Sequence, residues 1–333
     1  MKTLIIAEIA QAHEGSLGIA YSYIDALAAC GVDAVKFQTH VAEAESSLAE
    51  PFRVKFSYVD QTRMDYWKRM EFTLEQWKGL KSHCDEVGVE FMSSPFSCAA
   101  VDILEEVGVK RYKIGSGEVS NFLLLEKIAR TGKPIILSSG MSDYRELVET
   151  IDFLRPFGNE LSILQCTTAY PTAPEQWGLQ ELAVLKEKFG LPVGYSDHSA
   201  DITACIAASA LGAEILEFHA VFDRRMFGPD AKASLEINEI KQLVASVRRL
   251  EQSFAADASK LDVSKYSELK TMFGKSLAVN KALKAGHVLR REDLESKKPS
   301  DQGIPAKFFQ QVIGKVLNKN LNQWDFLREE DLK

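Results

Sequence analysis

Short apolar runs alternate with longer amphipathic segments along the first 254 residues of the chain. The runs are rich in branched aliphatic residues and have the length of buried parallel strands. The segments between them repeat apolar residues at helical spacing, as Ile19, Tyr23 and Leu27 do before Gly31, where a helix is expected to end. The expected strands are residues 3–9, 32–37, 89–92, 110–114, 134–138, 161–165, 191–195 and 213–219. Eight strands alternating with helices predict an α/β fold, the (β/α)8 TIM barrel.

A long connection at residues 40–72 interrupts this alternation. Basic residues such as Arg53, Arg63 and Arg69 lie in it among aromatic ones. A connection of this length is usually functional or has structure of its own, although a solvated surface helix would explain the charges equally well. The next helix is expected to begin at Thr73, because Gln76 completes the pattern of a capping box.

The chain after residue 254 follows a different pattern. Residues 255–274 show neither the short apolar runs of strands nor apolar residues at helical spacing. They are expected to form a linker. Beyond them, segment 281–294 returns as segment 319–332, with matching apolar residues and a shared Glu-Asp-Leu ending. Short, glycine-punctuated apolar runs predict a small, mostly β module with an internal repeat at residues 275–333. A module of about 60 residues is marginally stable alone and is expected to dock on another surface.

Composition narrows the class of protein. The chain has 333 residues, of which 46% are hydrophobic, which suffices for a large core. Its 40 basic and 47 acidic residues give a net charge of −7 without long basic runs, which argues against a nucleic-acid or membrane-surface partner. The cysteines are scattered and odd in number, so free thiols are expected. No apolar run approaches the ~20 residues of a membrane span, and a cytoplasmic protein is expected.

Polar residues recur at or just beyond the C-terminal ends of the expected strands, which is where TIM barrels carry their active sites. Two of them, His198 and His219, end consecutive strands and are placed to converge on one divalent cation. Taken singly, each is equally typical of a half-buried structural histidine. The other members of this group are Glu8, Lys36, Ser94, Lys113, Ser138 and Ser196.

The lysines in this group indicate an anion. Lys36 faces inward by strand alternation, and a buried lysine needs an anionic partner. Lys113 precedes Gly115-Ser116-Gly117, and bare backbone N–H groups beside an ammonium suit phosphate. Glu8 is either a site residue or half of a structural ion pair.

A series of short motifs runs through the chain in order. They are Ala7-Glu8-Ile9, His13-Glu14-Gly15, Ala34-Val35-Lys36-Phe37-Gln38, Ser94-Pro95-Phe96, Tyr112-Lys113-Ile114-Gly115-Ser116-Gly117-Glu118, Ile136-Leu137-Ser138-Ser139-Gly140-Met141, Tyr170-Pro171-Thr172, Gly194-Tyr195-Ser196-Asp197-His198 and Gly228-Pro229-Asp230. With these motifs the chain resembles the sialic acid synthases, which make N-acetylneuraminate and its bacterial relatives. The resemblance covers nearly the whole chain, and the last module resembles their antifreeze-like SAF domain.

The resemblance implies a transferase that condenses phosphoenolpyruvate with the open-chain aldehyde of an N-acylated amino sugar, giving a nonulosonic acid and phosphate. It implies that His198 and His219 hold Mn²⁺, with Mg²⁺ or Co²⁺ as alternatives. The matching phosphoenolpyruvate contacts are Lys36, Ser94, Lys113, Ser116, Ser138 and Ser196. The matching residues around metal and sugar are Glu8, Gln38, Glu118, Tyr170 and Asp230.

The chain also departs from the family pattern. Gln11-Ala12-His13-Glu14-Gly15 stands where the family has Asn-His-Asn-Gly or Asn-His-Glu-Gly, and Thr168 stands where an asparagine commonly contacts phosphoenolpyruvate. Lys298-Pro299-Ser300 replaces an Arg-Pro-Gly stretch whose arginine reaches the partner subunit's site. Lysine keeps the charge but lacks the planar fork of arginine. We therefore expect a homodimer in which the SAF-like module covers the partner's barrel mouth and offers Lys298.

These residues are also compatible with two other functions. A different phosphoenolpyruvate-condensing synthase, for a keto-deoxy sugar acid, would share the barrel but normally lacks the second module. A non-catalytic saccharide-binding scaffold would not need inward lysines and a histidine pair at one barrel mouth. The acceptor also stays open among N-acetylmannosamine, its 6-phosphate and a 6-deoxy-diacetamido sugar.

Overall fold

The computed structural model of the chain describes residues 2–54, 58–256, 260 and 262–333. Its contacts divide into two compact units, Met1–Ala256 and Asp257–Lys333, and each unit has its own hydrophobic core. No helix in the described ranges combines the length and apolar character needed to cross a membrane.

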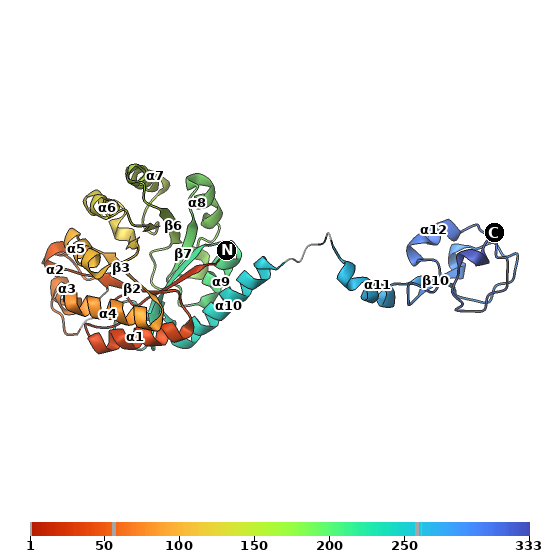
Figure 1. Ribbon diagram of the computed structural model, residues 1–333, viewed down its shortest axis with the longest axis horizontal. Helices are drawn as coiled ribbons and strands as arrows, with labels where there is room; N and C mark the ends of the chain where they lie inside the picture. The colour runs from red at the N-terminus through yellow and green to blue at the C-terminus, as the bar shows by residue number, and fades with distance from the viewer. Residues whose placement is uncertain (1, 55–57, 257–259, 261) are drawn as a thin grey trace. The chain divides into compact units, whose positions relative to one another are not determined.

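The first unit is a closed parallel barrel (Figure 1), which confirms the predicted fold. Neighbouring strands pair in chain order, and β1 closes the sheet by pairing with β8. A two-residue strand, β9 (Leu235–Glu236), pairs in parallel with the last residues of β8. The barrel strands are β1 (Leu4–Glu8), β2 (Ala34–Thr39), β3 (Glu90–Pro95), β4 (Tyr112–Ile114), β5 (Ile135–Ser138), β6 (Leu161–Cys166), β7 (Val193–Asp197) and β8 (Ile215–Val221).

Helices surround the strands, as Figure 1 shows. The predicted capping box of Thr73 and Gln76 begins α4 (Leu74–Val87), and Gly88 ends this helix in a left-handed conformation. Ser97 likewise caps α5. The helices around the barrel are α1 (Leu17–Cys30), α4 (Leu74–Val87), α5 (Cys98–Val107), α6 (Phe122–Ala129), α7 (Tyr144–Leu154), α8 (Glu181–Phe189), α9 (Ile202–Ala210) and α10 (Ile237–Ala255).

Alternate residues of each strand belong to different cores. Val35 and Phe37 pack outward against the helices. Their neighbours on the opposite face fill the barrel interior in a small separate cluster of Ile6, Ala34, Met92, Ile136, Leu164 and Ile215. Because side chains on a strand alternate, the residues two positions further on also point into the barrel, at its C-terminal mouth. These residues are Glu8, Lys36, Ser94, Ser138, Cys166 and Glu217.

The long connection at residues 40–72 has structure of its own. It contains α2 (Ala42–Glu45) and α3 (Arg63–Met70). Buried side chains of these helices form a satellite core of Ala42, Tyr66, Trp67 and Met70. The connection therefore has a small hydrophobic core of its own.

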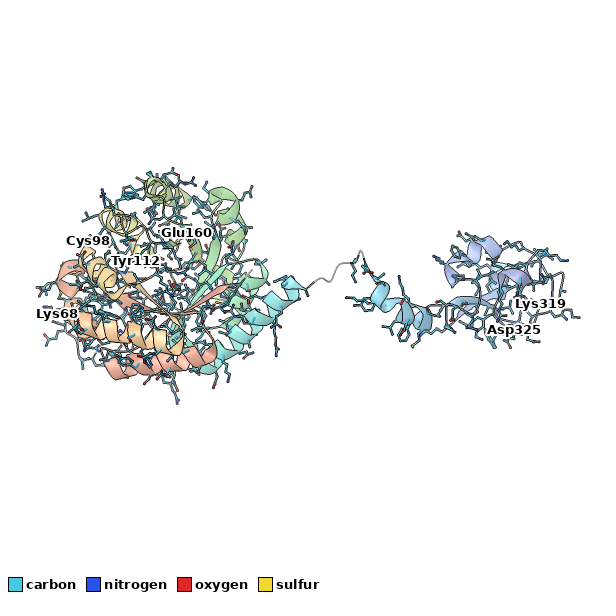
Figure 2. All side chains as sticks on the ribbon, viewed as in Figure 1. Lys68, Cys98, Tyr112, Glu160, Lys319 and Asp325 are labelled. Atoms are coloured by element: carbon cyan, nitrogen blue, oxygen red, sulfur yellow. The ribbon has the colours of Figure 1, made fainter. Side chains whose placement is uncertain are left out.

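The second unit is built from the internal repeat. Strands β10 (Ser276–Val279) and β11 (Leu294–Lys297) pair antiparallel, and Leu283 pairs with its repeat equivalent Leu321. Each repeat ends in a buried aspartate that binds the first lysine of its own repeat, Asp293 with Lys281 and Asp331 with Lys319. Figure 2 labels Lys319 in this unit.

The stretch expected to be a linker, residues 255–274, contains a helix in its described part, α11 (Ser267–Phe273). Residues 257–259 and 261 of that stretch lie outside the described residues. The second unit also contains the short α12 (Phe309–Val312).

Candidate active site

A cavity of about 450 Å³ lies at the C-terminal ends of the barrel strands. Strand alternation explains its composition, because every lining residue on a strand is an inward-facing one. The predicted site residues that line it are Glu8, Lys36, Gln38, Ser94, Lys113, Ser116, Ser138, Thr168, Tyr170, Ser196, His198, His219 and Asp230.

Two buried lysines stand in the cavity wall, each beside a carboxylate. Lys36 Nζ lies 2.7 Å from Glu8 Oε1 and donates to Ser94 Oγ at 3.2 Å. Lys113 Nζ lies 3.4 Å from Glu217 Oε1. Burial alone would raise the pKa of Glu8, but the Lys36 ammonium and the other polar neighbours hold that pKa far below its usual value. Glu8 is therefore an ionised carboxylate throughout the neutral range.

Hydroxyl groups from Ser116, which follows β4, from Ser138 on β5 and from Ser196 on β7 line the cavity together with the lysines. Ser116 Oγ lies 2.9 Å from Ser138 Oγ, and Ser196 Oγ donates to Glu217 Oε1 at 3.3 Å. Gly140 leaves room for the hydroxyl groups of Ser116 and Thr168, because a Cβ at that position would collide with both. Ammonium and hydroxyl donors around one hollow are suited to a small, strongly anionic ligand.

The two histidines face each other across the cavity, with ring centroids 5.2 Å apart. His198 Nδ1 lies 3.1 Å from the carbonyl oxygen of Thr167, an arrangement that leaves Nε2 for another partner. His219 Nε2 lies 3.8 Å from Glu8 Oε2, and its Nδ1 lies 4.0 Å from Asp230 Oδ2. Burial lowers the pKa of His219, which favours the neutral ring that binds metals.

This donor set fits a divalent cation that keeps open coordination positions. Imidazole nitrogens suit divalent transition metals such as Zn²⁺ or Fe²⁺, and the carboxylates within 4.0 Å of one ring supply the oxygen donors that suit Mn²⁺. No group of three or more histidine, cysteine, aspartate or glutamate side chains within the described ranges is arranged to hold a metal by itself. The remaining positions on such a cation are thus left for water or substrate oxygens.

One wall of the cavity comes from the 40–72 connection, and the sequence did not single out its residues as part of the site. Arg53 pairs with Asp230 at 2.7 Å and its guanidinium lies 4.2 Å from the Tyr170 ring centre. Arg63 lies 3.3 Å from Glu50, and its guanidinium stacks over Trp67 at 4.1 Å. The mixed basic and aromatic composition of this connection was the available signal, but it is equally typical of a surface helix. Gln11, Phe96 and Met141 also line the cavity.

Two predicted site residues lie elsewhere. Glu118 is absent from the cavity lining and accepts a hydrogen bond from Asn121 Nδ2 at 2.7 Å. Burial raises the pKa of its carboxyl group, and nearby Glu45 adds to the effect. Lys298 belongs to the second unit, where its ammonium lies 4.9 Å from the Phe273 ring centre.

Two inward-facing residues were missed as candidates. Glu217 precedes His219 on the inward face of β8, and Oε2 of its buried carboxylate has no hydrogen-bond partner among the described residues. Cys166 ends β6, and its Sγ lies 3.9 Å from His198 Nδ1. Strand alternation alone would have found both residues.

Comparison with known proteins assigns the chain to a family. Residues 23–259 match the NeuB family, and residues 274–333 match the SAF domain. The chain belongs to the NeuB family. Within this family, the N,N'-diacetyllegionaminic acid synthase of Campylobacter jejuni is 36% identical over 334 residues, covering 98% of this chain and 99% of the relative. The N-acetylneuraminate-9-phosphate synthase of Mus musculus is 33% identical over 99% of this chain and 92% of its own length.

A solved structure agrees with the assignment to the NeuB family. The N-acetylneuraminic acid synthetase of Leptospira borgpetersenii superposes with a TM-score of 0.71 at 29% identity. The alignment covers 81% of this chain and 91% of that one. Both relatives found by sequence span the barrel and the second module, so the resemblance extends over the whole two-unit chain.

Proposed function

We propose that this NeuB-family chain is a transferase that condenses phosphoenolpyruvate with the aldehyde of an N-acylated amino sugar and releases phosphate. The observation that carries the proposal is the anion hollow beside the histidine pair. Lys36, Lys113 and the surrounding hydroxyl groups suit phosphoenolpyruvate, and the facing histidines suit a cation at the aldehyde. The SAF match at residues 274–333 disfavours a barrel-only keto-deoxy sugar acid synthase.

The phosphate and carboxylate of phosphoenolpyruvate lie, in this proposal, between the two lysines and the serine hydroxyls. Held there, its C3 attacks the aldehyde carbon, the C3–C bond forms from the enol π electrons, and the aldehyde oxygen takes up a proton. Water then adds at C2 and gives its proton to a carboxylate. The C2–O bond to phosphate breaks, a ketone remains at C2, and hydrogen phosphate departs.

Two carboxylates of the cavity are placed for these proton transfers. Glu217 stands beside Lys113 and Ser196, and its unpartnered Oε2 is available to hold the water that adds at C2. Glu8 turns Oε2 toward His219, on the side of the cavity proposed for the aldehyde. Tyr170 packs against His198, with ring centroids 4.2 Å apart, and closes that side against solvent.

We further propose that His198 and His219 hold a divalent cation, Mn²⁺ before Mg²⁺ or Co²⁺. When bound, such a cation polarises the aldehyde carbonyl toward attack. The proposal is supported by the donor atoms and by the Thr167 carbonyl, which orients the His198 ring.

The acceptor in this proposal is an uncharged sugar. Every cation among the described lining residues already faces a carboxylate, the pairs being Lys36 with Glu8, Lys113 with Glu217, Arg53 with Asp230 and Arg63 with Glu50. The positive charges of the cavity are thus balanced by carboxylates, and bound phosphoenolpyruvate adds a large negative charge. A second phosphate on the sugar would compete with phosphoenolpyruvate for the donors that these paired cations still have, and would be repelled by its phosphate.

The active unit is proposed to be a cytoplasmic homodimer in which the second unit of one subunit covers the barrel mouth of the other. Among the described residues of the small second unit, nine buried hydrophobic side chains form its core cluster, and a module of this kind gains stability by docking. Lys298 would be offered to the partner's site. Free cysteines, five in number, suit a reducing compartment.

The test is phosphate release from phosphoenolpyruvate with a panel of acceptors and Mn²⁺. N-acetylmannosamine, its 6-phosphate and a 6-deoxy-diacetamido sugar are compared, with product identified by mass spectrometry. We expect release with an uncharged sugar and a kcat/KM at least about tenfold lower with the 6-phosphate, the scale of one uncompensated charge contact. Preference for the 6-phosphate would overturn the acceptor assignment, and no release with any sugar would overturn the function.

A further inference from the structure

A buried chain of hydrogen bonds leads to Glu8 from outside the cavity wall. His40 Nδ1 lies 2.6 Å from Glu45 Oε1, and His40 Nε2 lies 3.2 Å from Gln11 Nε2. The Gln11 amide donates to Gln38 Oε1. The Gln38 amide in turn donates to Glu8 Oε1 at 2.7 Å. One connected path therefore joins the carboxylate of α2 to the carboxylate at the end of β1.

The first two members of this path do not touch the cavity. Gln11, Gln38 and Glu8 line it, whereas neither His40 nor Glu45 is among the described lining residues. The His40 ring is 3% exposed. It is sandwiched between the rings of Trp67 and Phe96, whose centroids lie 3.9 and 4.9 Å away. His40 and Glu45 thus influence the site only through other side chains.

The chemistry of the partners sets the direction of every bond in the path. A carboxylate only accepts, so the His40 ring carries its proton on Nδ1 and Nε2 is an acceptor. The Gln11 amide nitrogen has two protons, one for His40 Nε2 and one for Gln38 Oε1. Gln38 therefore presents its N–H₂ group, not its carbonyl, to Glu8.

The opposite tautomer would reverse this order. An N–H at His40 Nε2 would face the Gln11 amide nitrogen, and two donors repel. Turning Gln11 over would bring its carbonyl against that of Gln38, and turning Gln38 over would bring a carbonyl against the Glu8 carboxylate. Each of these alternatives places like partners together, so the hydrogen bond that His40 donates to Glu45 and the carboxylate acceptor at Glu8 set the same order from the two ends of the path.

The end of the path controls one oxygen of Glu8. Oε1 receives both the Gln38 amide and the Lys36 ammonium. Oε2 is thereby left facing His219 at 3.8 Å, on the side of the cavity proposed for the aldehyde. Losing the Gln38 bond would let the carboxylate turn about its own axis and carry Oε2 away from that position.

We infer that Glu45 and His40 form a positioning dyad, which holds Glu8 in its working orientation through the two glutamine side chains. The effect of the dyad on turnover rests on the proposed function. The ring tautomer of His40, in contrast, is a property of the free protein and needs no substrate.

The test compares three single variants in the full chain. Glu45→Met removes the acceptor for Nδ1–H, whereas Glu45→Gln keeps a carbonyl acceptor there. Glu43→Met is the matched control, because Glu43 lies on the same helix, its side chain is 81% exposed and it pairs with Lys68. Lys68 lies at the outer edge of the barrel unit, as Figure 2 shows. Imidazole ¹⁵N NMR reports the tautomer, and the His40 signal is assigned among the six histidines from its loss in His40→Phe.

We expect Nδ1–H in the wild type, in Glu45→Gln and in Glu43→Met, and a shift toward Nε2–H in Glu45→Met, where only the Gln11 amide still opposes that form. We expect kcat to fall about tenfold in Glu45→Met, the scale of one hydrogen bond to a charged group, with a smaller change in the KM for phosphoenolpyruvate. The double variant His40→Phe/Glu45→Met leaves no buried charge unpaired and keeps the ring stack. If Glu45→Met alone does not fold, this double variant takes its place in the test, and it should show the same fall in kcat.

Retention of Nδ1–H in Glu45→Met, or wild-type kcat in the double variant, would overturn the dyad. If kcat falls as far in Glu45→Gln as in Glu45→Met while Nδ1–H is retained, the loss of charge alone explains the fall. That result would also overturn the dyad. An inactive wild type with the expected tautomers would instead count against the proposed function, since the NMR result does not depend on it.

Discussion

Replacement of Lys36 by Met separates anion binding from structural pairing. In the structure, the Lys36 ammonium is 2% exposed and lies 2.7 Å from Glu8 Oε1. Removing it leaves a buried carboxylate without its cation. Breaking a buried pair in this way costs about 3–5 kcal/mol of unfolding free energy. A loss of stability is therefore expected whether or not the lysine also binds substrate.

The affinity for phosphoenolpyruvate is the deciding quantity. A charge-assisted hydrogen bond contributes about 1.5–3 kcal/mol, which corresponds to a rise in Kd of about 10- to 150-fold. Calorimetric titration measures this Kd directly. It requires no turnover, which matters because the second variant below alters a proposed catalytic carboxylate.

The double variant Lys36→Met/Glu8→Gln gives the test its contrast. It removes both charges, so the unfolding free energy should recover toward the wild-type value. The Kd should stay high if Lys36 binds the anion. Lys133→Met is the control, since Lys133 pairs with Glu105 at 2.6 Å away from the cavity lining. Recovery of wild-type affinity in the double variant would refute the binding role.

Three further outcomes are expected. His198→Ala should abolish the activity that EDTA removes and added Mn²⁺ restores, with the circular dichroism unchanged; full activity in this variant would contradict the metal assignment. Asp293 is buried, but Lys281 and His287 hold its pKa at about 2, below the ordinary value of 3.8. The stability that its ionised form contributes is therefore present above about pH 4 and is lost as the pH falls toward 2. Amide exchange of residues 276–297 in the full chain should speed up over that interval, and Asp293→Asn should remove the pH dependence. A His198→Ala chain and a chain truncated before residue 276, refolded together, should regain partial activity; proven heterodimers without activity would exclude an exchanged second unit.

The barrel and the inward set of site residues were predictable because both depend on local periodicity. Alternation along each strand identifies which residues share a face, and parallel strands bring their C-terminal ends to one mouth. Glu8, Lys36 and Ser196 needed no other information. The same rule places Glu217 on the face of His219 and Cys166 at the inward end of its strand, but neither was chosen as a candidate.

The wall built by the 40–72 connection was not predictable in this way. Arg53 and Arg63 line the cavity, and α3, which carries Arg63, packs in the satellite core through tertiary contacts. Charged and aromatic residues at helical spacing have the same appearance on a solvated surface. The dyad of Glu45 and His40 has no local signature either, because its effect depends on contacts between segments that are distant in the sequence.

The inward lysines also show why two interpretations that compete in the sequence need not compete in the structure. An ammonium has three donors. Lys36 uses two of them on Glu8 and Ser94. Lys113 uses two on Glu217 and the carbonyl oxygen of Ile114. Each lysine is therefore compensated in the free protein, which limits the cost of its burial, and still has one donor for an anion. A structural ion pair and an anion site are then one arrangement, and the carboxylate that stabilises the lysine stays beside the ligand to take part in proton transfer.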